Sequence, residues 1–146
     1  MNYDDALKWE KYNDLNRQYR NCMAQGWFTA RRRAFAVAVK KPYPSFYITA
    51  EYCVKMFRWI ESDNPKLKTM LPLTRKKLDH LYARYLEIRK DEPDTPKIDI
   101  CERIIHETAP ELYMTGDSAY NFWVDMRKKK RLLDKLKNTH TDEKTH

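Results

Sequence analysis

Glycine is scarce in this sequence, which has only Gly26 and Gly116 among its 146 residues. Average usage is about 7%, so the shortage argues against glycine-rich phosphate-binding loops and against a turn-rich β fold. Apolar runs are also short. None approaches the length of a transmembrane helix, and the polar, acidic N-terminal residues do not resemble a signal peptide. These absences predict a cytoplasmic protein with no membrane partner.

Cysteine is nearly as rare, with Cys22, Cys53 and Cys101 far apart and no Cys-x-x-Cys pair. Each lies among apolar neighbours, which favours a small buried thiol over a metal ligand or a redox centre. Free thiols are typical of a reducing compartment. We therefore expect the cytoplasm.

Motifs of catalysis are missing too. The sequence has no nucleophile motif, no phosphate loop and no His-Glu-x-x-His metal pattern. Glu102 and His106 lie one helical turn apart, but a surface pair explains this spacing. We expect a non-enzymatic protein with no cofactor, no metal and no small-molecule substrate.

What the chain does have is long segments of helical periodicity, which predict an all-α fold. Gly26 is placed to end the first helix in a left-handed conformation. Threonines at positions 29, 49, 74, 95 and 115 are expected N-caps of the later helices. The expected helices cover residues 4–25, 30–41, 50–61, about 75–90, about 96–105 and about 116–136.

One short phrase occurs twice, as Pro44-Ser-Phe-Tyr-Ile-Thr49 and as Pro110-Glu-Leu-Tyr-Met-Thr115. The offset of 66 residues also superimposes the flanking helices without a gap. It predicts a six-helix domain built from two tandem three-helix repeats with a basic C-terminal helix and tail. The expected parts are a first repeat over 1–62, a linker over 63–73, a second repeat over 74–137 and a polar tail over 138–146.

The repeated phrase has two interpretations. It makes an extended, stiff entry into a helix, with aromatic residues packed into the core. Alternatively, Tyr47 and Tyr113 present their hydroxyl groups to a partner. Trp59 is a further candidate partner contact, because the second half has Asp125 in its place.

The formal net charge of +8 is consistent with an anionic partner or with a well-solvated basic surface. Arg31, Arg32 and Arg33 lie in the first turn of a predicted helix, where positive charge opposes the helix dipole. A bound anion would reverse that penalty. The second cationic run comprises Arg127, Lys128, Lys129, Lys130 and Arg131, and such a run binds phosphate backbones or acidic proteins by charge alone.

The helices at 30–41 and 50–61 also suggest a helix-turn-helix, repeated in the second half. Lys55 and Arg58 would then face a DNA groove. The connection of about seven residues is longer than the three or four that this motif uses.

The doubled Pro-x-Phe/Leu-Tyr-x-Thr phrase resembles that of small, uncharacterised helical proteins from gut-bacterial phages and mobile elements. The resemblance implies a phage or mobile-element protein and carries no active site. Our leading hypothesis is a structural component of a phage-like particle that packs against neighbouring subunits and lies near the DNA phosphate backbone. The alternatives are a tandem helix-turn-helix-like DNA-binding regulator and a basic inhibitor of an acidic host protein.

Overall fold

The computed structural model describes residues 3–26 and 30–145, and this part of the chain is all-helical, with no strand. The expected all-α class is therefore confirmed. The helices are α1 (Tyr3–Ala24), α2 (Arg31–Ala38), α3 (Ala50–Glu61), the 3₁₀ helix η1 (Pro65–Thr69), α4 (Pro72–Asp91), α5 (Lys97–Ile104) and α6 (Gly116–Thr145).

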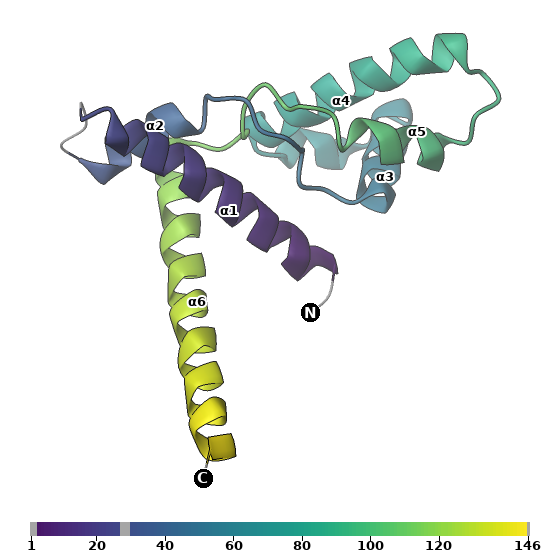
Figure 1. Ribbon diagram of the computed structural model, residues 1–146. Helices are drawn as coiled ribbons and strands as arrows, with labels where there is room; N and C mark the ends of the chain where they lie inside the picture. The colour runs from purple at the N-terminus through teal and green to yellow at the C-terminus, as the bar shows by residue number, and fades with distance from the viewer. Residues whose placement is uncertain (1–2, 27–29, 146) are drawn as a thin grey trace.

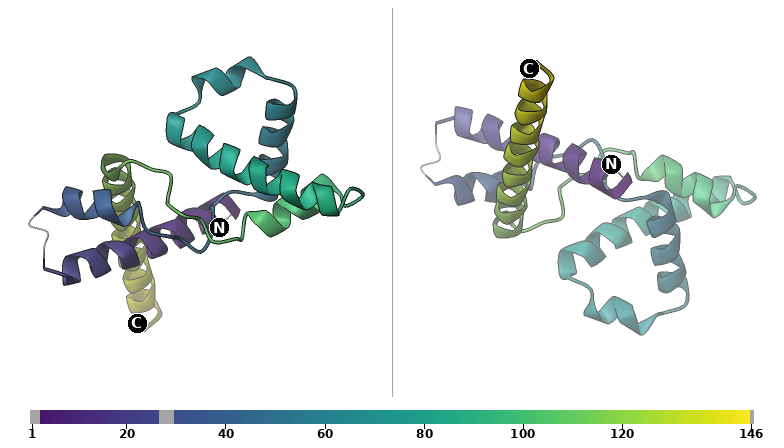
Figure 2. Two further views of the ribbon diagram at one scale, coloured as in Figure 1. Left: turned by 90° about the horizontal axis from the view of Figure 1, so that it is seen from above. Right: turned by 90° about the horizontal axis from the view of Figure 1, so that it is seen from below.

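These helices form two lobes (Figure 1). In lobe one, α1, α2 and α6 pack against one another, and in lobe two α3, α4 and α5 do the same. The last helix of each 66-residue half therefore packs in the lobe that holds the first two helices of the other half. The views from above and below show α3, η1 and α4 following one another around the edge of lobe two (Figure 2).

Two segments cross between the lobes, and they pair where they meet. Tyr43 and Ala109 exchange backbone hydrogen bonds of 2.8 and 2.7 Å in an isolated antiparallel bridge. Their positions differ by 66, and we call two residues related by this offset counterparts. The bonds from Phe46 N to Ile105 O (3.1 Å) and from Leu112 N to Val39 O (2.9 Å) also exchange under this offset. An approximate two-fold axis therefore relates the two crossing segments to each other.

The sequence led us to expect an extended conformation throughout the repeated phrase, but each copy bends at its tyrosine. Tyr47 and Tyr113 adopt left-handed conformations with φ of 57° and 59°, which non-glycine residues seldom do. The Ser45 hydroxyl accepts a bond from the Tyr47 amide at 3.2 Å and supports the first of these bends. Such a bend lets the chain turn from the crossing into a helix of the opposite lobe.

Caps begin the two helices that follow the crossings. Thr49 Oγ1 accepts from Tyr52 N at 3.0 Å, and Thr115 Oγ1 accepts from Ser118 N at 3.1 Å. Both predicted caps are confirmed, as is the left-handed Gly26, with φ of 74°.

Two other predicted caps are wrong. α4 begins at Pro72, two residues before Thr74, because proline is well suited to the first turn of a helix. Pro96 is the N-cap of α5, and the hydroxyl of Thr95 instead donates to Glu92 Oε1 at 3.2 Å. Thr29 lies outside the described residues.

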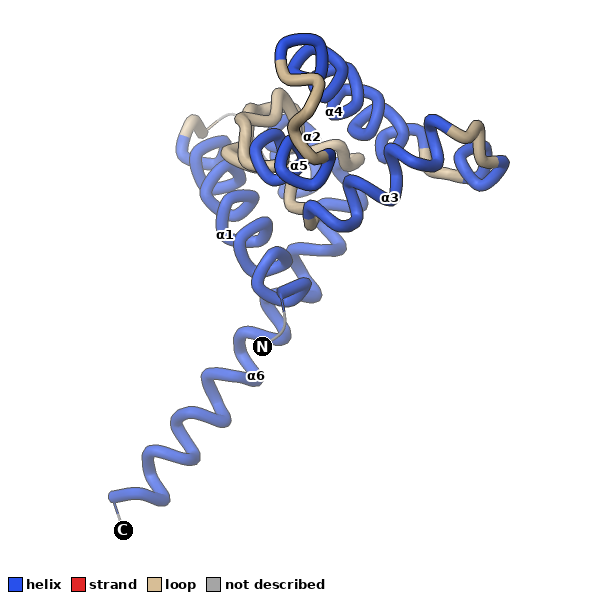
Figure 3. The backbone as a smooth tube through the Cα atoms, turned by 90° about the vertical axis from the view of Figure 1, so that its right-hand side faces the viewer, coloured by secondary structure: helices blue, strands red, loops and turns tan. Residues whose placement is uncertain are grey.

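The C-terminal end also differs from the expectation. α6 does not end near residue 136 but continues to Thr145, because no proline or glycine interrupts it after Gly116. Its second half projects away from both lobes (Figures 1 and 3). Leu132 and Leu136 on this half are 61% and 66% exposed.

The interior is apolar and rich in aromatic rings. All three cysteines are free and buried within it, as predicted. Tyr19 lies 5.1 Å from Trp123 in lobe one, and their counterparts Tyr85 and Phe57 lie 5.0 Å apart in lobe two, measured between ring centroids. Within 3–26 and 30–145, no helix combines the length and the apolar character that crossing a membrane requires.

Candidate nucleic-acid interface

The candidate site is built on Trp123, a buried residue in the second turn of α6. Its indole Nε1 donates a hydrogen bond to Asn16 Oδ1 on α1 at 2.9 Å. Its ring lies against Tyr19 and, at 5.3 Å between centroids, against Phe35 of α2. Because residues of α1 and α2 hold this ring of α6, its position and orientation are fixed.

Two arginines from distant parts of the sequence meet on that ring. The guanidinium carbon of Arg127 lies 4.4 Å from the ring centroid, and that of Arg31, the first residue of α2, lies 5.9 Å from it. Both distances are within cation–π range. Neither arginine forms an ion pair or hydrogen bond with another residue that the structure describes. The crossing of the chain therefore brings together the two cationic runs that the sequence showed separately.

These arginines lie in a hollow of about 350 Å³, which we call the Trp123 groove. The lining contains five cationic side chains and a single acidic one. Its residues are Tyr12, Asn16, Tyr19, Arg20, Arg31, Trp123, Arg127, Lys130, Arg131 and Asp134. Such a lining attracts anions and raises their local concentration.

Lobe two has a different arrangement at the same positions. The counterparts of Arg31 and Arg127 are Lys97 and Glu61, and these two form an ion pair. Lys97 Nζ also lies 5.9 Å from the ring centroid of Tyr85, so a cation over an aromatic ring occurs in both lobes. Lobe two thus supplies its own carboxylate where lobe one has a second guanidinium group.

The remaining predicted cations are spread over the surface. Arg32 pairs with Asp117 at 3.4 Å and lies over the Tyr120 ring, so its charge is partly neutralised. Arg33 and Lys128 are exposed and do not line the groove. Lys129 lines a neighbouring, mostly apolar hollow beside Trp9.

The predicted contacts on α3 lie in lobe two, apart from the groove. Lys55 and Lys66 place their ammonium groups 5.2 and 5.4 Å from the Trp59 ring centroid. Arg58 is exposed on the same helix. These residues form a smaller basic surface around one aromatic side chain.

The two tyrosines of the repeated phrase differ in how the chain holds them. Tyr113 is buried, and burial together with the charge of Glu111 raises its pKa to about 12. The Tyr47 hydroxyl donates to Asp14 Oδ2 at 2.5 Å, and burial followed by this bond raises the pKa of Tyr47. Both side chains contribute to packing between elements, through ring contacts with Tyr43 and Phe46, and contact of either with a partner stays a prediction.

The helix-turn-helix arrangement is not formed. That motif requires its two helices to be adjacent, whereas α2 packs in lobe one and α3 in lobe two. α5 and α6 are separated between the lobes in the same way, because the connecting segments cross instead of turning back.

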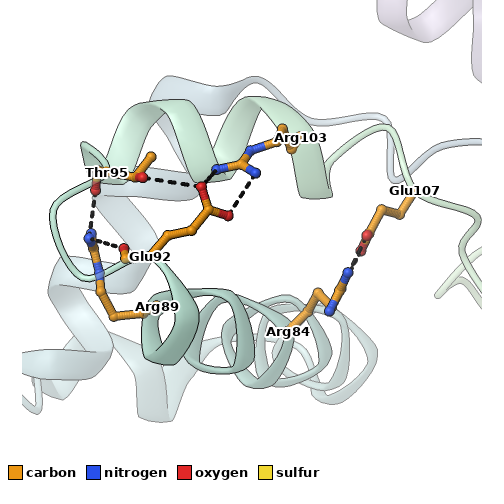
Figure 4. A network of polar contacts seen from close by, with 6 residues as sticks. All are labelled: Arg84, Arg89, Glu92, Thr95, Arg103 and Glu107. Carbon is orange, nitrogen blue, oxygen red and sulfur yellow. Dashed lines mark hydrogen bonds and ion pairs between the residues drawn. The ribbon is translucent and has the colours of Figure 1, made fainter.

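Lobe two pairs many of its charges internally (Figure 4). Arg103 makes a two-point contact with the Glu92 carboxylate at 2.9 and 3.0 Å, and the pKa of Glu92 is lowered, chiefly by this bond. Arg84 contacts both oxygens of Glu107 at 3.0 and 3.1 Å. Arg89 donates to three backbone carbonyls in the α4–α5 connection, including that of Pro93 at 3.0 Å. These cations hold the lobe together.

Sequence reasoning missed Arg20, Asn16 and Trp123 as parts of the site. The alignment of the two halves did carry a signal for the arginines, because Arg31 and Arg127 have as their counterparts Lys97 and Glu61, two residues of opposite charge. Only the packing of α6 against α1 shows that Arg20 and Asn16 join them.

No group of three or more histidine, cysteine, aspartate or glutamate side chains suited to a metal ion occurs in the described part of the chain. Comparisons with protein-family models, with curated proteins and with solved structures gave no match to this sequence.

Proposed function

We propose that this protein binds and assembles without catalysing a reaction, and that it holds the phosphate backbone of nucleic acid in the Trp123 groove. The observation that carries the proposal is the contrast between Arg31 with Arg127 and their counterparts Lys97 with Glu61. One lobe closes an ion pair internally, and the other has two guanidinium groups at one ring with no carboxylate of the described residues paired with either. An external anion would take the place of the missing carboxylate.

The chemistry of the groove fits phosphate in particular. Guanidinium groups donate in a planar fork that matches phosphate oxygens, and the fixed Trp123 ring holds Arg127 in place before a ligand arrives. Lys130 and Arg131 continue the positive surface along α6. Contacts of this kind bind the backbone and do not distinguish bases, so we expect little sequence preference.

The assembly part of the proposal rests on the projecting half of α6. Leu132, Leu133 and Leu136 are exposed on it, and they lie among cations in a segment that extends beyond both lobes (Figure 3). We propose that neighbouring subunits of a phage-like particle cover these leucines while the groove contacts the packaged DNA.

Binding of random-sequence duplex DNA, followed by fluorescence anisotropy at several salt concentrations, tests the first part. We expect the double variant Arg31→Gln/Arg127→Gln to bind at least tenfold more weakly. Its slope of log affinity against log salt should be shallower by about two, because each arginine removed leaves one phosphate without its cation. The matched control is Lys55→Gln/Arg58→Gln, which removes the same charge from lobe two and should change affinity less than threefold.

Equal losses of affinity in both double variants would show that net charge alone attracts DNA and would contradict the groove. Light scattering tests the assembly: we expect large oligomers in the unmodified chain and smaller species in Leu132→Ser/Leu136→Ser. A stable monomer that protects one specific DNA site would instead support the regulator. A single acidic protein partner with no DNA binding would support the inhibitor.

A further inference from the structure

A second cavity lies on the other side of α1, between the two lobes. Its volume is about 490 Å³, within the range of small-molecule sites. Residues of α1, α3, α4 and the first crossing segment form its walls, together with Phe122 of α6. The lining residues are Leu7, Lys8, Lys11, Tyr47, Ile48, Thr49, Tyr52, Thr74, Lys77, Leu78 and Phe122.

Two lysines in this lining are counterparts, Lys11 from α1 and Lys77 from α4. They therefore approach one cavity from the two sides of the approximate axis that also relates the crossing segments. Burial lowers the pKa of Lys11, and burial together with the charge of Lys11 lowers that of Lys77 to about 8. The two ammonium groups thus share one poorly hydrated space.

No carboxylate of the described residues compensates for these charges. Neither lysine forms an ion pair or hydrogen bond with a residue that the structure describes, and Lys11 Nζ instead lies 5.1 Å from the Phe122 ring centroid. Asp14, which accepts from the lining residue Tyr47, also pairs with Arg17 at 3.3 Å. Two like charges without a counter-ion raise the energy of the empty site.

The other polar side chains of the lining can all donate hydrogen bonds. The hydroxyl groups of Tyr52 and Thr74 have no hydrogen-bond partner within the described chain, whereas that of Thr49 caps α3. Lys8 adds a third ammonium group. The rest of the wall is apolar, with Phe122 and Ile48 among the larger side chains.

We propose that this cavity binds a small phosphate monoester, with its dianionic phosphate between Lys11 and Lys77 and its organic part against Phe122 and Ile48. Two ammonium groups match the two charges of a monoester phosphate. A backbone diester carries only one charge, so this site is separate from the Trp123 groove in both position and ligand.

Calorimetric titration of the full chain with phenyl phosphate tests the proposal. We expect saturable binding at one site per chain, at least tenfold weaker in Lys77→Met and in Lys11→Met. Methionine keeps most of the volume and removes the charge, and circular dichroism checks that each variant is folded. The control Lys68→Met removes one exposed charge in η1 and should leave the affinity unchanged. Dimethyl phosphate, a monoanion, should bind at least tenfold more weakly than phenyl phosphate.

A second measurement does not depend on the variants. Nitrogen-15 spectra of the Lys77 side chain in the unmodified protein should show its pKa rising by more than one unit when phenyl phosphate is bound. The spectroscopic sample holds the protein at millimolar concentration. If phenyl phosphate shows no saturable binding at up to 10-fold above that concentration, the proposal is overturned. Equal affinity for the diester, or equal weakening in Lys68→Met, would also overturn it. Loss of phenyl phosphate binding only in Arg31→Gln/Arg127→Gln would move the ligand to the Trp123 groove and reject this site.

Discussion

The two lobes place three helices around similar aromatic pairs but satisfy their charges differently. In lobe two, Arg103 and Lys97 each face a carboxylate supplied by the chain itself. In lobe one, Arg31 and Arg127 lie on the same indole ring with no such partner among the described residues. Because the surrounding helices correspond, the contrast arises from a few side chains and not from the backbone.

This contrast indicates that the charged side chains of the two lobes serve different purposes. Paired charges connect α4 with α5 and fix the geometry of lobe two (Figure 4). Surface pairs contribute little stability individually, but networks contribute more. Arg31 and Arg127 contribute no such pairing within the described chain, so we attribute their alignment on Trp123 to the proposed ligand and not to folding.

The largest expected effect comes from giving lobe one the charge pattern of lobe two. Arg127→Glu would pair with Arg31 as Glu61 does with Lys97 and would close the Trp123 groove. We expect DNA affinity to fall about 100-fold at low salt, or about 2.7 kcal/mol, without loss of thermal stability. Anisotropy and thermal unfolding measure the two quantities.

The reverse exchange, Glu61→Arg, should break the pair with Lys97 and open a second cationic site. We expect a gain in DNA affinity of a few-fold and a loss of stability of about 1 kcal/mol. Glu102→Arg is the control, since it adds the same charge at an exposed position of α5 that does not face Lys97. If this control gains as much affinity as Glu61→Arg, the comparison between the lobes has no bearing on binding.

Much of each half could be predicted from its own residues. The caps Thr49 and Thr115, the left-handed Gly26 and the buried cysteines all follow from local rules that operate within one helix or turn. The polar end of α6 was predicted as a tail because it has no apolar stripe, although the absence of helix-breaking residues allows the helix to continue.

The crossing of the chain was beyond such rules. A phrase such as 44–49 fits equally well whether the following helix returns to its own half or packs in the other. Apolar periodicity shows which face of a helix is buried but not which partner buries it. The site depends on this choice, because Arg31 and Arg127 meet only when α6 packs against α2. Sequence therefore identified the cationic runs but not their convergence on Trp123.

An intermediate effect is expected from a substitution at Gly116, where α6 approaches the backbone of α2. A Cβ atom at Gly116 would lie 2.8 Å from Ala36 Cα and 2.9 Å from Ala36 N, both backbone atoms. Gly116→Ala must therefore push the two helices apart, and overpacking of this kind costs about 1–3 kcal/mol. Denaturant unfolding should show this loss of stability, and DNA affinity should fall as Arg31 and Arg127 separate.

The counterpart of Gly116 is Ala50, which is buried at the start of α3 in lobe two. Ala50→Gly should cost no more than about 1 kcal/mol, through chain entropy and weaker packing, and should leave DNA binding unchanged. A Gly116→Ala variant as stable as the unmodified protein would mean that lobe one packs no more tightly than lobe two at this point.

The smallest expected effect concerns Glu111, a buried carboxylate on the second crossing segment whose counterpart is Ser45. It accepts from Lys76 of lobe two at 2.6 Å and from Lys40, beyond the end of α2, at 3.5 Å. Burial acts to raise the pKa of Glu111, but the bond from Lys76 and the charge of Lys40 outweigh it, so the pKa is lowered below 4.5. The carboxylate therefore links groups from both halves of the chain.

The direction of the pH effect follows from that lowered pKa. Above about pH 4.5 the folded and unfolded states both carry the charge, and its stabilisation is fully present. As the pH falls through the folded-state pKa, the carboxylate takes up a proton and the stabilisation is lost.

Glu111→Gln should therefore cost about 1 kcal/mol at pH 7, since both lysines are partly solvated. The difference from the unmodified protein should shrink as the pH falls below about 4.5, measured by urea unfolding. Ser45→Ala removes only neutral bonds at the counterpart position, the one to Ile105 O and the one from Tyr47 N, so it should show a difference that does not vary with pH. A constant difference in Glu111→Gln would mean that its charge does not couple the two halves.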